Sequence, residues 1–327
     1  MSVTNRRFAV ATLLTGVIAG LVGLACIHLL HWIQALAWDM HSGTLLEAVS
    51  AASPARRVLN LVLGGILGAA SWFFLFRRSR AITSVSAAVG GTPMPPLRAT
   101  WHALTQVLIV GLGASVGREV APREMAAAFS AAAADRLGLT PEDRRIIVAC
   151  GAGAGLAAVY SIPISGAIYT LEILLVSRSR RAVAAAFCTS AIAVLISTGF
   201  TRPEAFYTVP TLTPSMSLTV FAAIAGPLFG AAGWAFKKAV ARISADRPRD
   251  WRVLVALPIA SFLVGVTSVW VPSVVGNGQA SAQTQFDATW AAGAGLAFAL
   301  LVLLAKTATT LLTIRAGGWG GVLTPAV

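Results

Sequence analysis

Charged residues are scarce in this chain, and acidic residues are the scarcest of them. Of its 327 residues only 11% are charged, and 12 Asp and Glu stand against 25 Lys and Arg. A soluble domain carries about 25% charged residues, so this composition excludes an ordinary soluble protein. Only 3 tyrosines, beside many Ala, Val, Leu and Gly, also argue against a membrane β-barrel, whose strands alternate apolar and polar residues. The 3 cysteines lie apart in apolar segments, which excludes a disulfide framework or a zinc site.

What the chain has instead is long stretches without any Asp, Glu, Lys or Arg. Together with a hydrophobic content of 57% these stretches predict an integral membrane protein. A spanning helix needs about 20 apolar residues, so eight or more helices fit. The charge-free stretches are 8–38, 58–76, 99–117, 146–171, 182–201, 205–236, 253–286 and 288–305.

The net charge of +13 lies in short loops between the apolar stretches. In a soluble protein such a charge would indicate a nucleic-acid partner, but here the positive-inside rule explains it. We therefore predict no nucleic-acid binding, a cytoplasmic N-terminus and basic loops on the cytoplasmic side. The clusters are Arg6-Arg7, Arg77-Arg78-Arg80, Arg144-Arg145, Arg178-Arg180-Arg181, and Lys237-Lys238 through Arg252.

Glycine, proline or charge interrupts several apolar stretches. Residues 118–137 predict a half-helix, Pro163 breaks the next stretch, and 276–278 form a Gly-Asn-Gly break. Broken helices in both halves of a chain are typical of transporters with inverted repeats. We predict an all-α, polytopic fold with a first transmembrane repeat at 1–205 and a partial second repeat at 206–327. Uninterrupted helices are expected at 8–37, 56–76, 98–116, 182–199, 214–242, 252–271 and 291–314.

Glu119 ends a charge-free stretch and precedes the half-helix. A carboxylate at membrane depth is costly and indicates a functional site by default, and a helix N-terminus attracts anions. Glu119 is therefore predicted to act as a removable plug of an anion site. The alternative is a structural ion pair with Arg118 or Arg123.

Three motifs, in their order and spacing, resemble the CLC family of chloride channels and proton-coupled chloride transporters. Gly117-Arg118-Glu119 resembles the family's Gly-Arg/Lys-Glu-Gly-Pro motif, although Val120-Ala121 replaces Gly-Pro. The run Gly151–Glu172 is similar to the family's glycine- and alanine-rich helix pair, and Gly321–Pro325 resembles Gly-x-Phe-x-Pro. The resemblance covers nearly all of the chain.

The resemblance implies transport of small monovalent anions, chloride by default, along a path gated by Glu119. It implies a homodimer in the lipid bilayer of the bacterial plasma membrane, with one path per subunit, no cofactor and no enzymatic activity. Main-chain N–H groups would replace the water of the anion. The expected anion-binding residues are Gly117, Arg118, Val120, Gly321, Val322 and Leu323.

The family's first motif, Gly-Ser-Gly-Ile-Pro, is not intact here. By spacing its place falls on 79–83, where Arg80 stands for the serine that contacts chloride. A second candidate is 90–93, which contains Thr92. Selectivity for chloride therefore stays open.

Exchangers of the family often carry a second, cytoplasm-facing glutamate, and the matching position is Ile173. This favours passive movement, with proton-coupled antiport as the alternative. The neighbouring Glu172 is either part of a proton path or a helix-end carboxylate paired with Arg178 or Arg181.

Three further points stay open. A membrane enzyme using Glu119 as a general base would need a polar partner at the same depth, and none is evident. A family member should continue past Pro325, so the chain is expected to be truncated at Val327, and a non-transporting, degenerate or truncated scaffold is a further alternative. Lys306, inside an apolar stretch, either raises the potential of the anion path or snorkels or pairs.

Overall fold

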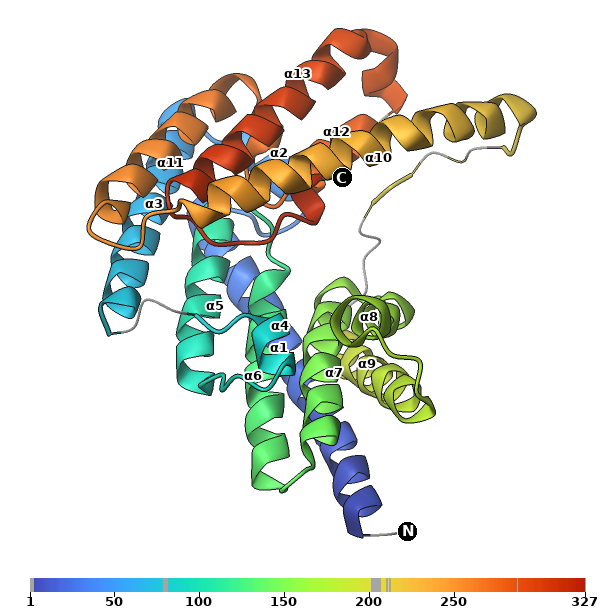
Figure 1. Cartoon of the computed structure of the whole chain (residues 1–327). Helices are drawn as coiled ribbons and strands as arrows, with labels where there is room; N and C mark the ends of the chain where they lie inside the picture. Colours follow the sequence, from blue (N-terminus) through green and yellow to red (C-terminus); the bar gives the residue numbers. More distant parts are fainter. Residues whose placement is uncertain are drawn as a thin grey trace. The chain divides into compact units, whose positions relative to one another are not determined.

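A computed structural model describes residues 3–78, 82–200, 207–209, 211, 213–286 and 288–326. These residues are almost entirely helical (Figure 1), and outside the helices they pair only in a single antiparallel bridge between Gly117 and Gly321. The elements are, in chain order, α1 (Val3–Trp38), α2 (Leu45–Ala51), α3 (Pro54–Arg78), α4 (Val85–Val89), α5 (Pro96–Gly111), α6 (Val120–Arg136), α7 (Pro141–Tyr160), α8 (Pro163–Tyr169), a π-helix (Thr170–Leu175), α9 (Arg180–Gly199), α10 (Met216–Ala245), α11 (Val253–Trp270), a 3-10 turn (Pro272–Val274), α12 (Gln279–Phe286), α13 (Ala288–Arg315) and a 3-10 turn (Thr324–Ala326).

Among the described residues, 6 helices are long and apolar enough to cross a membrane. Of the other apolar stretches, 146–171 is divided into two helices at the predicted break around Pro163. The all-α membrane architecture expected from the sequence is thus confirmed. The 6 candidate spans are Val3–Trp38, Pro54–Arg77, Arg180–Gly199, Met216–Ala245, Val253–Trp270 and Gly295–Arg315.

The helix expected at 98–116 was predicted too long, because α5 ends at Gly111. Gly113 has φ +106°, a conformation that a side chain disfavours. A Cβ atom there would also lie 2.8 Å from the ring of Trp38. The chain therefore leaves the helix and runs as an irregular segment up to Gly117.

The chain forms two compact units. Unit 1 comprises Met1–Ile33, Phe74–Leu108 and Arg118–Glu204, and unit 2 comprises Gln34–Phe73, Ile109–Gly117 and Ala205–Val327. The compact units thus draw on discontinuous stretches of sequence. Arg80 of the degenerate first motif lies outside the described residues.

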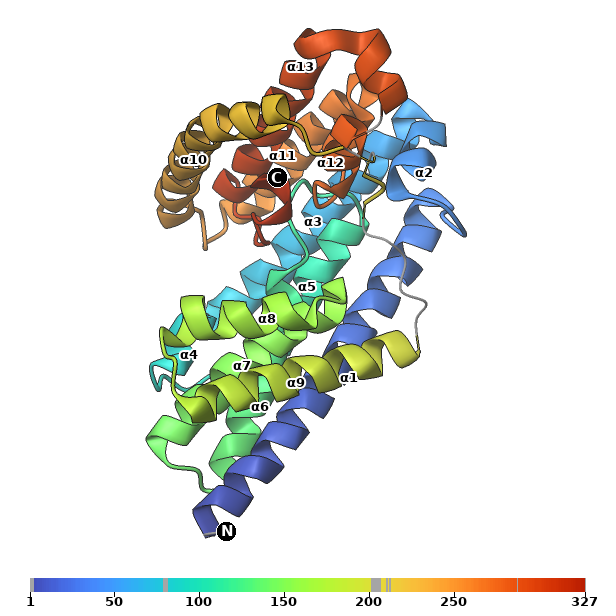
Figure 2. The same ribbon diagram turned by 90° about the vertical axis from the view of Figure 1, so that its right-hand side faces the viewer.

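In unit 1, glycines on α7 allow its neighbours to approach closely, as the sequence predicts. A Cβ atom on Gly155 would lie 2.6 Å from the carbonyl oxygen of Pro122 on α6, and one on Gly166 of α8 would lie 2.6 Å from Ala157. Helices α8 and α9 pack against α7 on the side that Figure 2 shows. Small residues thus bring helix backbones together.

The break around Pro163 is confirmed. Helix α7 ends at Tyr160, the next residue Ser161 has a left-handed φ of +56°, and α8 begins at Pro163. Proline suits the first turn of a helix because N–H groups in that turn have no acceptor within the helix, so the lack of an N–H costs no hydrogen bond. Helix α8 then widens into the π-helix and stops at Val176, which is again left-handed.

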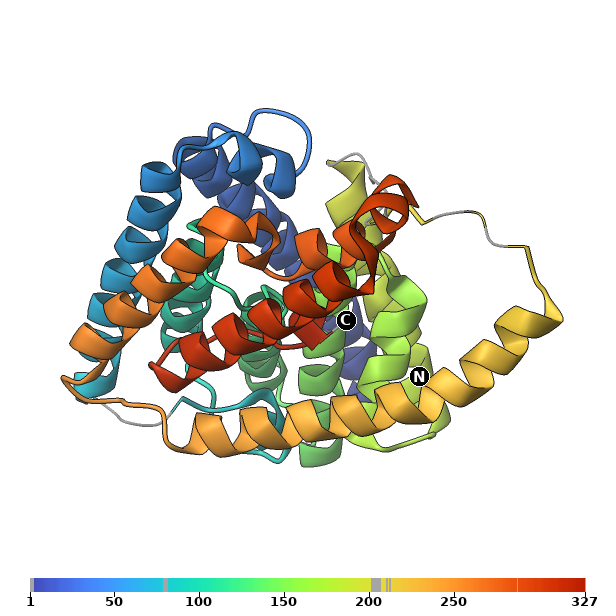
Figure 3. The same cartoon turned by 90° about the horizontal axis from the view of Figure 1, so that it is seen from above.

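In unit 2, α13 packs against α10 and α11. Figure 3 shows α10 beside the C-terminal part of α13 and then extending past the other helices of its unit. Helix α13 is interrupted at Gly295, which has φ 67° and ψ 177°. The predicted Gly-Asn-Gly break is present, with positive φ at Gly276 and Gly278.

Candidate functional site

Two glycine-containing loops of unit 2, one at Gly117 and one at Gly321, are joined by main-chain hydrogen bonds. The N–H of Gly117 donates to the carbonyl of Gly321 at 2.7 Å, and the N–H of Gly321 donates back at 2.8 Å. Both N–H groups are occupied, so neither donates to a ligand while this pair holds. Of the N–H groups expected to bind an anion, only those of the neighbouring residues in the two motifs remain available.

The close approach of the two loops depends on Gly320. A Cβ atom there would lie 2.6 Å from Cγ2 of Val116 and 3.1 Å from the carbonyl oxygen of Gly117. Beyond the pair, the N–H of Ala326 bonds to the carbonyls of Val322 and Leu323, which closes a short 3-10 turn. The N–H of Val322 meets no acceptor among the described residues.

Lys306 of α13 lies in the same unit and is buried, with 3% of its surface exposed. Its Nζ donates to Oγ of Ser115 at 3.0 Å, to the carbonyl of Val274 at 2.9 Å and to the carbonyl of Gly276 at 2.7 Å. Of the two alternatives for Lys306, the one in which it snorkels or forms an ion pair is wrong, because the side chain is buried and no described acid pairs with it. All of its partners in the described part of the chain are neutral oxygens.

Unit 1 holds Glu119, which immediately precedes α6 and is 1% exposed. Its side chain does not cap the helix. The hydroxyl of Tyr160, the last residue of α7, donates to Oε2 of Glu119 over a long 3.5 Å. Sequence reasoning missed Tyr160, because only the break after α7 marks its position.

Two arginines flank Glu119 in the sequence, and both stack on tyrosine rings. The guanidinium of Arg118 lies 5.6 Å from the ring centre of Tyr160, and that of Arg123 lies 5.0 Å from the ring centre of Tyr169. Cation–π contacts of this kind are worth about 0.5–2 kcal/mol. Arg123 makes no ion pair with Glu119 among the described residues, so the Arg123 half of that alternative is wrong, whereas the pair with Arg118 stays a prediction.

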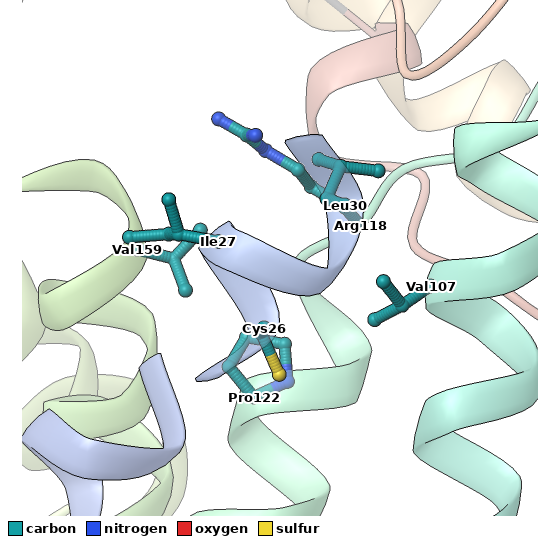
Figure 4. A pocket seen from close by; sticks show the side chains of 7 residues that line it. All are labelled: Cys26, Ile27, Leu30, Val107, Arg118, Pro122 and Val159. Carbon is teal, nitrogen blue, oxygen red and sulfur yellow. The ribbon is translucent and has the colours of Figure 1, made fainter. Parts of the chain in front are cut away.

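A small pocket of unit 1 lies beside the start of α6. Its walls are mainly apolar, and Arg118 is its one charged lining residue among those described. Figure 4 shows the guanidinium of Arg118 pointing away from Cys26 and Pro122. The lining residues are Cys26, Ile27, Leu30, Val107, Arg118, Pro122 and Val159.

A buried polar cluster joins α5 to α6. Nδ1 of His102 lies 2.6 Å from Oε2 of Glu124, and Nε2 of Gln106 donates to the same oxygen at 3.0 Å. His102 and Gln106 are fully buried, and Glu124 is 6% exposed. His102 and Gln106 are one helical turn apart on α5, but the sequence does not reveal that Glu124 of α6 joins them.

Glu172 lies on the π-helix with an exposed side chain. In the described part of the chain it pairs with neither Arg178 nor Arg181, so the ion-pair alternative was wrong. Arg181 instead binds Asp143, with its Nε 2.7 Å from a carboxylate oxygen. The described residues include no group of three or more His, Cys, Asp or Glu that could hold a metal ion.

Comparison with known proteins decides the family. Residues 64–327 match the voltage-gated chloride channel family. The chain belongs to this family. The CLC resemblance found in the motifs is thereby confirmed, and anion transport across a membrane is the activity of the family.

Curated CLC relatives cover almost the whole chain. The voltage-gated ClC-type chloride channel ClcB of Escherichia coli O81 (strain ED1a) is 27% identical over 337 residues, which cover 98% of this chain and 78% of the relative. The ClcB protein of Escherichia coli O157:H7 (strain EC4115 / EHEC) is 26% identical with the same coverage.

Solved structures show the CLC fold. A slow cyanobacterial Cl⁻/H⁺ antiporter matches with a TM-score of 0.80 at 20% identity, covering 98% of this chain and 76% of that one. A CLC-type fluoride/proton antiporter matches with a TM-score of 0.70 at 21% identity, covering 97% and 77%. The fold predicted from the sequence is therefore confirmed, whereas the roles of the site residues stay predictions.

Proposed function

We propose that this membrane protein moves small monovalent anions, chloride by default, and that Glu119 gates their path. The observation that carries the proposal is the burial of Glu119 at the start of α6. In the sequence Glu119 follows Gly117 by two positions, and Gly117 is anchored to Gly321. A buried carboxylate inside the membrane is costly, so its presence there indicates a functional role.

Backbone N–H groups are the proposed donors to the anion. The first N–H groups of a helix have no partner within it, and they carry partial positive charge. In α6 these belong to Val120 and its neighbours, while Pro122 contributes none. In unit 2 the N–H of Val322 is the corresponding donor, with Leu323 as a further candidate from the same motif. Arg118, which precedes Glu119 in unit 1, is the other candidate. Gly117 and Gly321 then hold the two loops together by their mutual hydrogen bonds and do not themselves donate to the anion.

A carboxylate and an anion compete for positive helix ends because they carry the same charge. Ionised Glu119 excludes the anion, whereas protonation or displacement of its side chain opens the path. The hydroxyl of Tyr160 steadies the carboxylate in its present position. This gives transport that depends on both pH and anion concentration.

Proton-coupled antiport is a second candidate mechanism. The similar solved structures include a Cl⁻/H⁺ antiporter and a fluoride/proton antiporter. Against coupling, Ile173 stands where exchangers carry a second glutamate, although the adjacent Glu172 is exposed and can exchange protons with water. Passive movement therefore remains the first proposal, with Glu172 as the proton entry if the protein is coupled.

The remaining parts of the proposal concern the setting of the protein. The basic residues Arg6 and Arg7 at the start of α1 favour a cytoplasmic N-terminus, and the ClcB relatives are bacterial, which supports a bacterial plasma membrane. We propose a homodimer with one path per subunit and no cofactor. The partners are then the anion and the lipid bilayer.

Chloride release from liposomes containing the purified full chain tests the gate. Wild-type protein should release chloride at a rate that varies with pH. Glu119→Gln should abolish this pH dependence, whereas Glu142→Gln, which alters an exposed carboxylate in the first turn of α7, should preserve it. No chloride release by wild type would refute the transport proposal, and an unchanged pH profile in Glu119→Gln would refute the gate. Proton uptake recorded at the same time separates antiport from passive movement.

A further inference from the structure

Lys306 is an ammonium group buried inside an apolar span. Its three N–H bonds are satisfied by Ser115, Val274 and Gly276, all within 3.0 Å. Hydrogen bonds to neutral oxygens solvate the ammonium, but no residue that the structure describes forms an ion pair with it. A buried charge is normally paired, because its removal from water is costly.

The described acidic residues of unit 2 do not supply that counter-charge. Every carboxylate in the described part of this unit is exposed, and none pairs with Lys306. Asp39 bonds to His41, and Glu47 caps the start of α2. The described carboxylates of unit 2 are Asp39, Glu47, Asp246 and Asp250.

Hydrogen bonds link Lys306 to the loop that ends at Gly117. Its acceptor Ser115 precedes Gly117 by two positions in the same irregular segment. The carbonyl of Gly276 accepts from Lys306, and the N–H of Gly276 donates to the carbonyl of Gly113 at 2.9 Å. The ammonium thus sits in the core that supports the Gly117–Gly321 pair.

We propose that Lys306 is the fixed positive charge for which the transported anion is the missing counter-ion, and that it sets the affinity of the protein for that anion. This inference rests on the proposed function. A monovalent anion at the glycine loop lies within the low-dielectric unit that holds the ammonium, where Coulomb attraction is weakly screened. Lys306 acts on the anion through its charge, and its hydrogen bonds keep that charge in place.

A purely structural role makes a different prediction. If Lys306 only tethers the loop, loss of its acceptor Ser115 and loss of its ammonium should have similar effects. If the charge matters, Ser115→Ala should retain anion affinity because the ammonium remains. Lys306→Met has nearly the same length without the charge, and Lys306→Arg keeps the charge in a different shape.

Chloride binding to the purified full chain, measured by isothermal titration calorimetry, tests the inference. We expect Lys306→Met to weaken chloride binding on the order of tenfold. Lys306→Arg and Ser115→Ala should stay within about threefold of wild type, a difference below one hydrogen bond to a charged group. Thermal unfolding of each variant shows that the binding protein is folded. Wild-type affinity in folded Lys306→Met would overturn the inference.

A second variant covers the case in which Lys306→Met does not fold. The hydroxyl of Thr309, on the next turn of α13, lies 3.0 Å from Oγ of Ser115. Thr309→Asp places a carboxylate beside the ammonium and supplies a counter-charge from the protein itself. It should weaken chloride binding as strongly as Lys306→Met, and unchanged binding would contradict the inference.

The outcome for wild type separates the two proposals. If wild-type protein neither binds nor transports chloride, the proposed function fails and the role of Lys306 fails with it. If wild type transports chloride and Lys306→Met binds it equally well, only the role of Lys306 fails.

Discussion

Gly117 and Gly321 hydrogen bond to each other in both directions, at 2.7 and 2.8 Å. They belong to the first and last motifs that carry the CLC resemblance. Their pairing leaves the neighbouring N–H groups, rather than their own, to meet an anion. The glycines are thus required for the approach of two backbones, and the loop geometry follows from the absence of side chains.

A methyl group at Gly320 should disturb this pair. In Gly320→Ala the Cβ atom meets Val116 at 2.6 Å, and the loops have to separate. We expect chloride release from liposomes to fall by about a hundredfold, the effect of losing one preorganised hydrogen-bond donor. Gly226→Ala is the matched control, because nothing lies within 4 Å of a Cβ atom at Gly226 of α10. Normal transport by Gly320→Ala would show that the glycine loop is not part of the path.

Tyr160→Phe removes the hydroxyl that donates to Glu119 and keeps the ring beneath Arg118. The carboxylate then loses one stabilising contact in its buried position. An anion should displace it more easily, so half-maximal transport should need less chloride. A long hydrogen bond contributes about 0.5–1.5 kcal/mol, and the expected change is a few-fold. A rise in the chloride requirement would mean that Tyr160 does not steady the closed gate.

Arg57 is buried and holds the C-terminal ends of two helices in unit 2. Its guanidinium donates to the carbonyls of Ser50 and Ala52 at α2 and to that of Ser268 on α11. Arg57→Ala leaves these buried carbonyls without a donor, and we expect a loss of about 3–5 kcal/mol in the free energy of unfolding.

Unfolding in denaturing detergent measures the effect of Arg57→Ala. Arg252→Ala is the control, because Arg252 is exposed and lies 3.9 Å from its partner Asp250. An exposed pair of this kind contributes at most about 1 kcal/mol. Equal stability of the two variants would contradict the assigned role of Arg57.

Much of the fold could be predicted from the sequence, because hydropathy and helix-breaking residues report directly on it. The break at Pro163 and the close packing of Gly155 are both visible as residue types. The short helices α2 and α4 were not predicted, since each is too short to show a period. The end of α5 was misplaced because nothing in the charge-free stretch reveals that Trp38 fills the space beside Gly113.

The candidate site could be predicted only in part. Motif spacing singled out Glu119, Gly117 and Gly321 as residues of interest. It did not reveal that the last two bond to each other, because that pairing is a property of three-dimensional packing. The partners of Lys306 were missed for the same reason, since hydropathy shows that a charge is buried but not which oxygens solvate it.

Unit 2 is built from stretches of sequence that are synthesised at different times. Its residues come from three stretches, the last of which contains Gly321. A growing polypeptide emerges from its N-terminus onward, so the segment ending at Gly117 enters the membrane long before its partner is synthesised. Until then the N–H and C=O groups of this segment must form hydrogen bonds with lipid headgroups, water or the insertion machinery. Maturation of this half of the molecule is therefore completed only after the translation of the final glycine motif.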